Sequence, residues 1–205
     1  MKTSVIAILC FCLLCLGSVV RADESPEIVR AKIGIQVRSG DEVRRATALE
    51  QVKAGDQLRI YLIAEPESAY IYIIHANQDA VARLNYKEGQ RKVAGGFPVM
   101  LPSMDKDTFY TIDGENPQES ITTICSPMPL VEVEALLNSE DLSYERWLEV
   151  EKALVDQSYI DLRDQVVKPW IIAGGVRSAD PFLGELQIFS GKSLVVRKYE
   201  FRVAE

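Results

Sequence analysis

The sequence predicts a mainly β protein: a β-sandwich of the immunoglobulin-like type, with a helical insertion before a C-terminal hairpin. Three observations lead to this fold class. Short runs of alternating apolar and polar residues, separated by turn residues, recur between residues 33 and 125. After Pro129 the apolar residues change to helical spacing, and the chain then ends in two β-rich runs. Many short strands with one helical excursion are typical of two stacked sheets.

The first predicted strands have one apolar face. Ile33, Ile35 and Val37 alternate with polar or small residues. After the turn at Gly55-Asp56, residues 57–64 alternate again and form the clearest amphipathic strand of the chain. Both strands therefore predict a sheet with one side in a core.

The next predicted strand, residues 70–75, has a different pattern. Its sequence, Tyr-Ile-Tyr-Ile-Ile-His, is apolar or aromatic on both alternating sets. This pattern predicts a central strand that is covered on both faces. A polar turn at 77–79 and a return run over 80–84 complete a predicted hairpin.

Three further strands are predicted before the helical insertion. Residues 97–101 alternate, but Pro98 and Pro102 cannot donate to a ladder, so we expect an edge strand there. A short strand around Phe109 and another over 121–125 follow. Ser126-Pro127 then ends the sheet.

The helical insertion is predicted over about residues 131–165. A short helix is expected at 131–137, and apolar residues at helical spacing predict a longer amphipathic helix over 143–157, with Ser143 as its cap. The C-terminal strands are predicted over about residues 183–204, as a hairpin around the turn at 190–193.

The first 22 residues have the features of a secretory signal. A positive start at Lys2 is followed by an apolar run, Val5–Leu16, and by small or short residues up to Ala22. The run is too short to span a bilayer comfortably. We therefore expect cleavage after Ala22 and a periplasmic or secreted protein, with an uncleaved anchor as the alternative.

Residues 23–205 are predicted to form a single domain of 183 residues, which is enough for one substantial core. This part has 21 basic and 30 acidic residues, a formal charge of −9, because the signal contains only Lys2 and Arg21 as charged residues. We do not expect so acidic a chain to bind nucleic acid or an anionic membrane surface. Cys125 is its only cysteine, so an internal disulfide is excluded, while an intermolecular one stays open.

A series of motifs covers about residues 50–130. Gly55-Asp56 precedes an alternating strand, and YIYIIHANQDAVARL (70–84), GGFPVMLP (95–102) and ESITTICSPMPL (119–130) follow. This order resembles the bacterial domain-of-unknown-function family numbered 4384, although Leu84-Asn85-Tyr86 replaces the Phe-Pro-Asn that members often have. The resemblance implies an extracytoplasmic sandwich-like module, of a kind also found attached to protease-like or kinase-like domains. It implies no catalytic residue.

His75 and Cys125 are the first candidates for chemistry. His75 is the only histidine, and a metal site normally needs three or four convergent ligands, so we interpret it as a strand-end imidazole whose polar edge meets water or a backbone carbonyl. Cys125 alternates with Ile121 and Thr123 on a strand, which favours a buried thiol. The alternative is a nucleophile with His75 as its base.

Three other motifs have structural explanations. SGKS at 190–193 lacks the glycine-rich start of a phosphate-binding loop and precedes a strand. The acidic loop Asp105–Glu115, which contains Asp107 and Asp113, fails the order of a calcium-binding loop, so a solvated loop is favoured over calcium. Tyr144 and Trp147 have the spacing of a helix that docks on a sheet, whereas Trp170 beside Pro169 is less constrained.

The favoured function is an exported, non-enzymatic β-sandwich that binds a protein or a cell-envelope component through loops or an edge strand. No cofactor or metal is expected, and no binding residue is assigned. One alternative is a thiol-dependent hydrolase that uses Cys125 and His75. Another is a small-ligand-binding protein in which the helical insertion forms a lid over an apolar pocket near Trp147 or Trp170.

Overall fold

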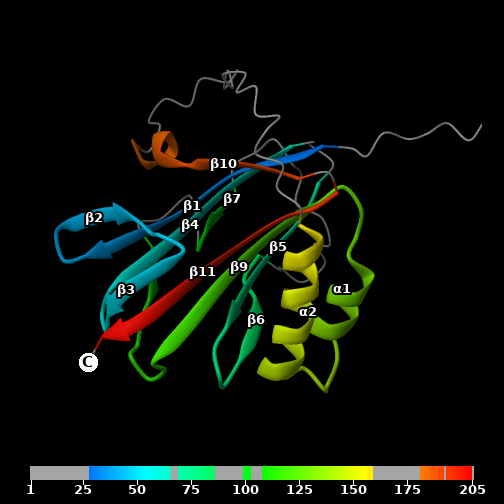
Figure 1. The fold of residues 1–205 in the computed structure, drawn as a ribbon. Helices are drawn as coiled ribbons and strands as arrows, with labels where there is room; N and C mark the ends of the chain where they lie inside the picture. Colours follow the sequence, from blue (N-terminus) through cyan, green and yellow to red (C-terminus); the bar gives the residue numbers. More distant parts are fainter. Residues whose placement is uncertain are drawn as a thin grey trace, which may run out of the picture.

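The computed structural model describes residues 28–65, 69–85, 99–102, 108–158, 181–191 and 193–204. Within these ranges the protein is mainly β, with two sheets and, before the C-terminal strands, two α-helices. Figure 1 shows the two sheets stacked, with both helices on the side of one sheet. The predicted β-sandwich with a helical segment before its last strands is confirmed.

The first sheet, sheet A, has the strand order β10-β1-β4-β7, with β2 paired to β1 and β8 paired to β4, all antiparallel. Its strands are β1 (Val29–Ser39), β2 (Glu42–Arg45), β4 (Gln57–Glu65), β7 (Val99–Leu101), β8 (Tyr110–Thr111) and β10 (Gln187–Gly191). As predicted, the run before Pro102 lies at an edge of the sheet. The strand expected around Phe109 begins one residue later.

The second sheet, sheet B, has the order β3-β11-β9-β5-β6. Its strands are β3 (Leu49–Lys53), β5 (Tyr70–Ala76), β6 (Val81–Arg83), β9 (Gln118–Ser126) and β11 (Val195–Ala204). All neighbours are antiparallel except β3, which runs parallel to β11. The predicted hairpin of 70–84 is confirmed as β5 and β6.

The main core lies between the two sheets. The alternating apolar residues of sheet A, such as Ile33, Ile35 and Ile60, are fully buried there. They contact residues of sheet B that include Ile73 and Phe201. This arrangement is the direct result of the period-two pattern, because one alternating set of each strand must leave water.

The outer face of sheet B is also apolar, and two helices cover it. Helix α1 (Val131–Leu137) and helix α2 (Tyr144–Gln157) form a second core with this face. The central contacts join Tyr72, Ile74, Ile124, Val133 and Trp147. The prediction that residues 70–75 are covered on both faces is therefore confirmed, and the molecule has three layers.

Helix α2 begins as predicted. Ser143 is extended, and its hydroxyl accepts a hydrogen bond from the Arg146 N–H at 3.3 Å. This bond satisfies one of the free N–H groups of the first turn.

A short 3-10 helix, η2 (Pro181–Glu185), covers part of the outer face of sheet A. The Phe182 ring lies 4.8 Å from the Tyr61 ring, between centroids. A Cβ atom on Gly34 would lie 2.7 Å from Leu186 Cδ2 and 3.3 Å from Phe182 Cε1. The missing side chain at Gly34 therefore lets this segment approach the sheet closely.

The predicted C-terminal hairpin is wrong in its pairing. Both strands are present, but β10 pairs with β1 in sheet A, whereas β11 pairs with β9 and β3 in sheet B. The physical reason is that β11 has buried apolar residues on both faces, such as Val195 and Val196, which only the doubly covered sheet B accommodates. The connection after Gly191 therefore crosses between the sheets.

Candidate functional site

Cys125 and His75 do not form a catalytic pair. Both side chains lie on the inner face of sheet B, but His75 is opposite Ile121 in the ladder and Cys125 is opposite Ile71. Four residues along a strand correspond to about 13 Å. The thiol is fully buried, and this burial raises the pKa of Cys125 to about 12. The nucleophile in the predicted alternative is therefore out of reach of His75 and buried away from solvent.

The imidazole of His75 has a carboxylate partner that the sequence did not reveal. Its Nε2 atom lies 3.1 Å from Glu119 Oε2, and both side chains are largely buried. The predicted partner was water or a backbone carbonyl. Among the described residues, no group of three or more His, Cys, Asp or Glu side chains is arranged to hold a metal ion.

The other predicted motifs are only partly within the described residues. Asp105, Asp107, Trp170 and Lys192 lie outside them. Asp113 accepts a hydrogen bond from the Glu115 N–H at 2.8 Å, as in an ordinary exposed turn. After the SGKS motif, strand β11 begins at Val195, so the helix that a phosphate-binding loop requires is not formed.

The helical aromatic residues are core contacts, as predicted. Trp147 is fully buried between α2 and sheet B, and Tyr144 contacts the same cluster. The predicted ligand pocket beneath Trp147 is therefore filled by the protein's own side chains.

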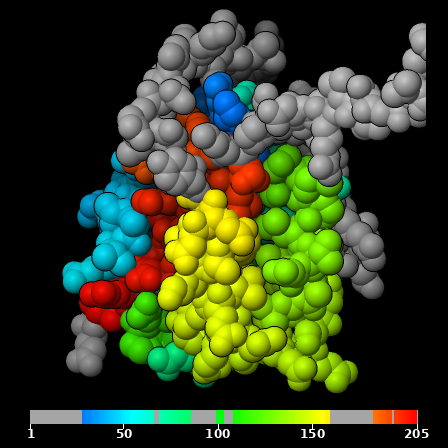
Figure 2. Space-filling view, turned by 45° about the vertical axis from the view of Figure 1, so that its right-hand side comes forward, coloured from blue at the N-terminus to red at the C-terminus, as the bar shows by residue number. Residues whose placement is uncertain are grey.

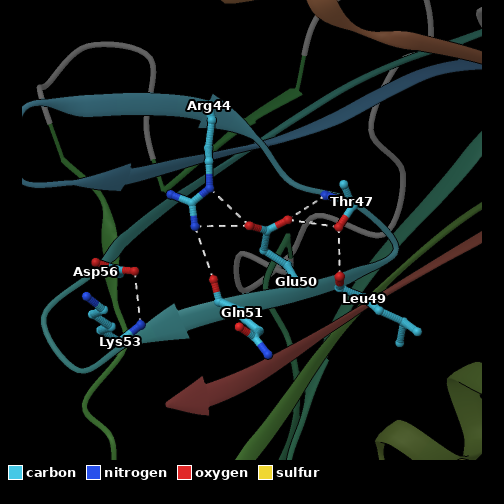
Figure 3. Close-up of polar contacts among 7 residues, drawn as sticks. All are labelled: Arg44, Thr47, Leu49, Glu50, Gln51, Lys53 and Asp56. Atoms are coloured by element: carbon cyan, nitrogen blue, oxygen red, sulfur yellow. Dashed lines mark hydrogen bonds and ion pairs between the residues drawn. The ribbon is translucent and has the colours of Figure 1, made fainter. Parts of the chain in front are cut away.

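A polar cluster around Glu50 joins the two sheets at the β2–β3 connection (Figure 3). Arg44 approaches Glu50 Oε1 with Nε and Nη2, each at 3.0 Å. The Thr47 N–H donates to Oε2 at 2.9 Å, and the Thr47 hydroxyl lies 2.9 Å from the same oxygen. Both carboxylate oxygens are thus occupied by the protein itself, so the cluster is a structural clamp between strands of different sheets.

A second polar cluster attaches helix α2 to sheet B. Glu151 is almost fully buried and accepts hydrogen bonds from the Thr122 hydroxyl and, at 2.8 Å, from Lys198 Nζ. Lys198 also lies 3.1 Å from Glu200. Burial by itself would lower the pKa of Lys198, but hydrogen bonds and negative charge from the two glutamates outweigh this effect and raise it.

A third polar cluster attaches α1. The Tyr72 hydroxyl donates to Glu134 Oε1 and accepts from the Leu130 N–H, both at 3.0 Å, while Arg83 lies 4.5 Å over the ring. Burial is the main cause that raises the pKa of Tyr72 to about 12. One tyrosine thereby holds the residue before α1 and the first turn of this helix on the sheet.

Between the two attached helices lies an open groove of about 500 Å³, which we call the α1–α2 groove. Figure 2 shows α2 in yellow with α1 beside it on this face. The lining residues come from the start of α1, with the two residues before it, and from the last nine residues of α2. They are Pro129, Leu130, Val131, Glu132, Val133, Glu149, Val150, Ala153, Leu154 and Gln157. Val131 is 71% exposed, and Met128, next to Pro129, is 68% exposed.

The helical layer around the groove is strongly acidic. Residues 129–158 contain eight acidic and two basic residues, a net charge of −6, against −7 for the whole chain. Glu132 lies on one wall of the groove and Glu149 on the other, and none of the lining residues within the described ranges is basic. The groove therefore combines apolar walls with a negative rim.

This groove was not predicted from the sequence, although the sequence contains one signal for it. The segment from Leu130 to Leu137 has apolar residues on more sides than one buried face requires, so some of them had to remain exposed.

Comparisons with known proteins identify no relative. The chain matches no protein family, no curated protein and no solved structure. The resemblance to family 4384 therefore stays a prediction. None of the helices in the described ranges is both long and apolar enough to cross a membrane.

Proposed function

We propose that the protein is an exported, non-enzymatic module that binds a partner protein in the α1–α2 groove. Export rests on the signal-like residues 1–22, and binding rests on one observation: an apolar groove with exposed Val131 at its rim. Exposed apolar surface of this kind, bordered by polar residues, is typical of interaction sites.

The shape of the groove favours a protein over a small molecule. Small-molecule pockets enclose most of their ligand and supply a few converging polar groups. The α1–α2 groove is only partly enclosed, and its charged residues, Glu132 and Glu149, are on opposite walls. Such a site suits an elongated apolar surface better than a compact ligand.

The groove is also a better binding site than the predicted edge strand. Strand β7 has only three residues, and Pro102, which lacks an N–H donor, follows it directly. Strand addition depends on a row of main-chain hydrogen bonds. The helical layer offers a larger surface on a rigid support, because separate polar clusters hold each helix on sheet B.

Photocrosslinking tests the proposed site. We would place a photoreactive amino acid at Val131, and as a control at Val43 on β2, and irradiate cells of the source organism. We expect one discrete adduct from Val131 and none from Val43. The partner identified from the adduct is then purified and titrated against Ala153→Tyr, which fills the groove, and Val155→Tyr, an exposed change on α2 outside it. Equal binding to both variants would reject the groove.

Export is tested separately. Fractionation of the same cells, followed by mass spectrometry of the N-terminus, should recover a chain that begins at Asp23 outside the cytoplasm. A full-length chain in the cytosol would contradict this part of the proposal.

A further inference from the structure

We infer that the occupant of the α1–α2 groove is a basic amphipathic helix of the partner protein. The inference rests on the proposed function and adds the chemistry of the bound segment. Two features of the groove carry it: the spacing of the lining residues on α2 and the sign of the charge on both walls.

The spacing indicates a helical occupant. The α2 residues that line the groove are 149, 150, 153, 154 and 157, which recur at three and four residues and form one straight face. This face extends over about 12 Å, at 1.5 Å per residue, or roughly two helical turns. A helix that lies along it presents apolar residues at the matching positions i, i+3, i+4 and i+7.

The charge indicates a basic occupant. Glu132 and Glu149 flank the groove, so a helix in it would have a carboxylate on each side of its apolar face. Glu134 does not contribute in this way, because it bonds Tyr72. Glu149 forms an ion pair with Arg146 at 3.4 Å, and both side chains are exposed, so this pair is weak. Glu149 can therefore exchange Arg146 for a basic side chain of the bound helix.

Other occupants fit these observations less well. Nucleic acid and anionic lipid carry the same sign of charge as the helical layer and would be repelled. A second copy would bring another layer of net charge −6 against the first, and no basic residue is among the described residues that line the groove to compensate. A basic helix alone satisfies both the apolar walls and the rim.

Defined peptides test the inference even while the partner itself is unidentified. Three fluorescent peptides of about 18 residues share one amphipathic design. The first has leucine on one face and lysine on the other, the second has glutamate in place of lysine, and the third has the first composition in scrambled order. Fluorescence anisotropy measures their binding to the whole protein. We expect the lysine helix to bind, the scrambled peptide to bind at least about tenfold more weakly, and the glutamate helix not to bind.

Matched variants separate charge from shape. The first double variant removes both groove carboxylates, Glu132→Gln with Glu149→Gln, and should raise the Kd of the lysine helix about three- to tenfold. The control double variant makes the same charge change at exposed sites outside the groove, Glu42→Gln with Glu115→Gln. It should leave the Kd unchanged. Ala153→Tyr should abolish binding, and Val155→Tyr should not.

The failures of the two proposals are distinguishable. If the glutamate helix or the scrambled peptide binds as well as the lysine helix, and Ala153→Tyr abolishes that binding, the groove stands and the basic helix is rejected. If Ala153→Tyr changes no binding, the groove itself is rejected. A dimer in sedimentation that Ala153→Tyr dissociates would make a second copy the occupant and would also overturn the inference.

Discussion

Replacing Lys198 with methionine should destabilise the protein in a pH-dependent way. The change removes the 2.8 Å ion pair with Glu151 but keeps the stem of the side chain in place. Glu151 remains almost fully buried, and its remaining hydrogen-bond partner among the described residues is the Thr122 hydroxyl. Removing one partner of a buried pair typically costs about 3–5 kcal/mol, because it leaves an uncompensated charge.

The cost of burying an unpaired carboxylate cannot exceed the cost of protonating it, because the protonated group carries no charge. At pH 7, protonating a glutamate of ordinary pKa, about 4.3, costs about 3.7 kcal/mol, and at pH 5 only about 1 kcal/mol. Lys198 is itself a quarter exposed, so the loss should lie somewhat below this limit. We therefore expect Lys198→Met to lower the free energy of unfolding by about 3 kcal/mol at pH 7 and about 1 kcal/mol at pH 5.

Urea titrations at the two pH values, followed by circular dichroism, measure this difference. Arg146→Met is the matched control on the same helix, because the Arg146–Glu149 pair is exposed, and it should cost less than about 0.5 kcal/mol at either pH. Adding Glu151→Gln to Lys198→Met should recover much of the loss at pH 7, since no charge is then buried. A loss that is the same at both pH values would refute the role of buried charge.

Three more predictions concern other parts of the fold. Cys125 should not react with a thiol reagent at pH 8 in the native protein but should react fully in urea. The reason is that a thiol with a pKa of about 12 has about a thousandfold less thiolate at this pH than a thiol with the ordinary pKa of 9.0. Fast labelling of the native protein would contradict the burial of Cys125. Gly34→Ala should lower the free energy of unfolding by about 1–3 kcal/mol through its clash with Leu186, whereas Gly184→Ala, in open space, should cost little in the same urea titration. Glu50→Ala should lower the free energy of unfolding by about 1–3 kcal/mol, because it leaves the Thr47 N–H and Arg44 without their shared acceptor. Its control is Glu42→Ala, at an exposed position of β2.

The faces of the strands could be predicted from the sequence, but their partners could not. Alternation shows which side of a strand is buried, and the doubly apolar run 70–75 correctly indicated a cover on both faces. The alternation of apolar and polar residues does not show which sheet a strand joins, so β10 and β11 were wrongly predicted to pair with each other. Strands β2 and β3 were missed because residues 42–53 are short, polar runs held by side chains such as Glu50.

The candidate site was beyond sequence reasoning for a related reason. Cys125 and His75 share a face of sheet B, and only the register of β5 against β9 shows that they are four residues apart. The α1–α2 groove depends on the distance between two helices, which no residue pattern encodes. The helices themselves, and the Ser143 cap, were predictable from local spacing.

The groove follows from how the helical layer is attached. Sheet B has an apolar outer face that must be covered, and α1 and α2 supply the cover. Each helix has its own polar attachment to the sheet, Tyr72 with Glu134 for α1 and Lys198 with Glu151 for α2. Both of these polar attachments, which lie within the described residues, lead to the sheet, so sheet B sets the position of each helix. The space between the helices therefore follows from where sheet B holds each of them.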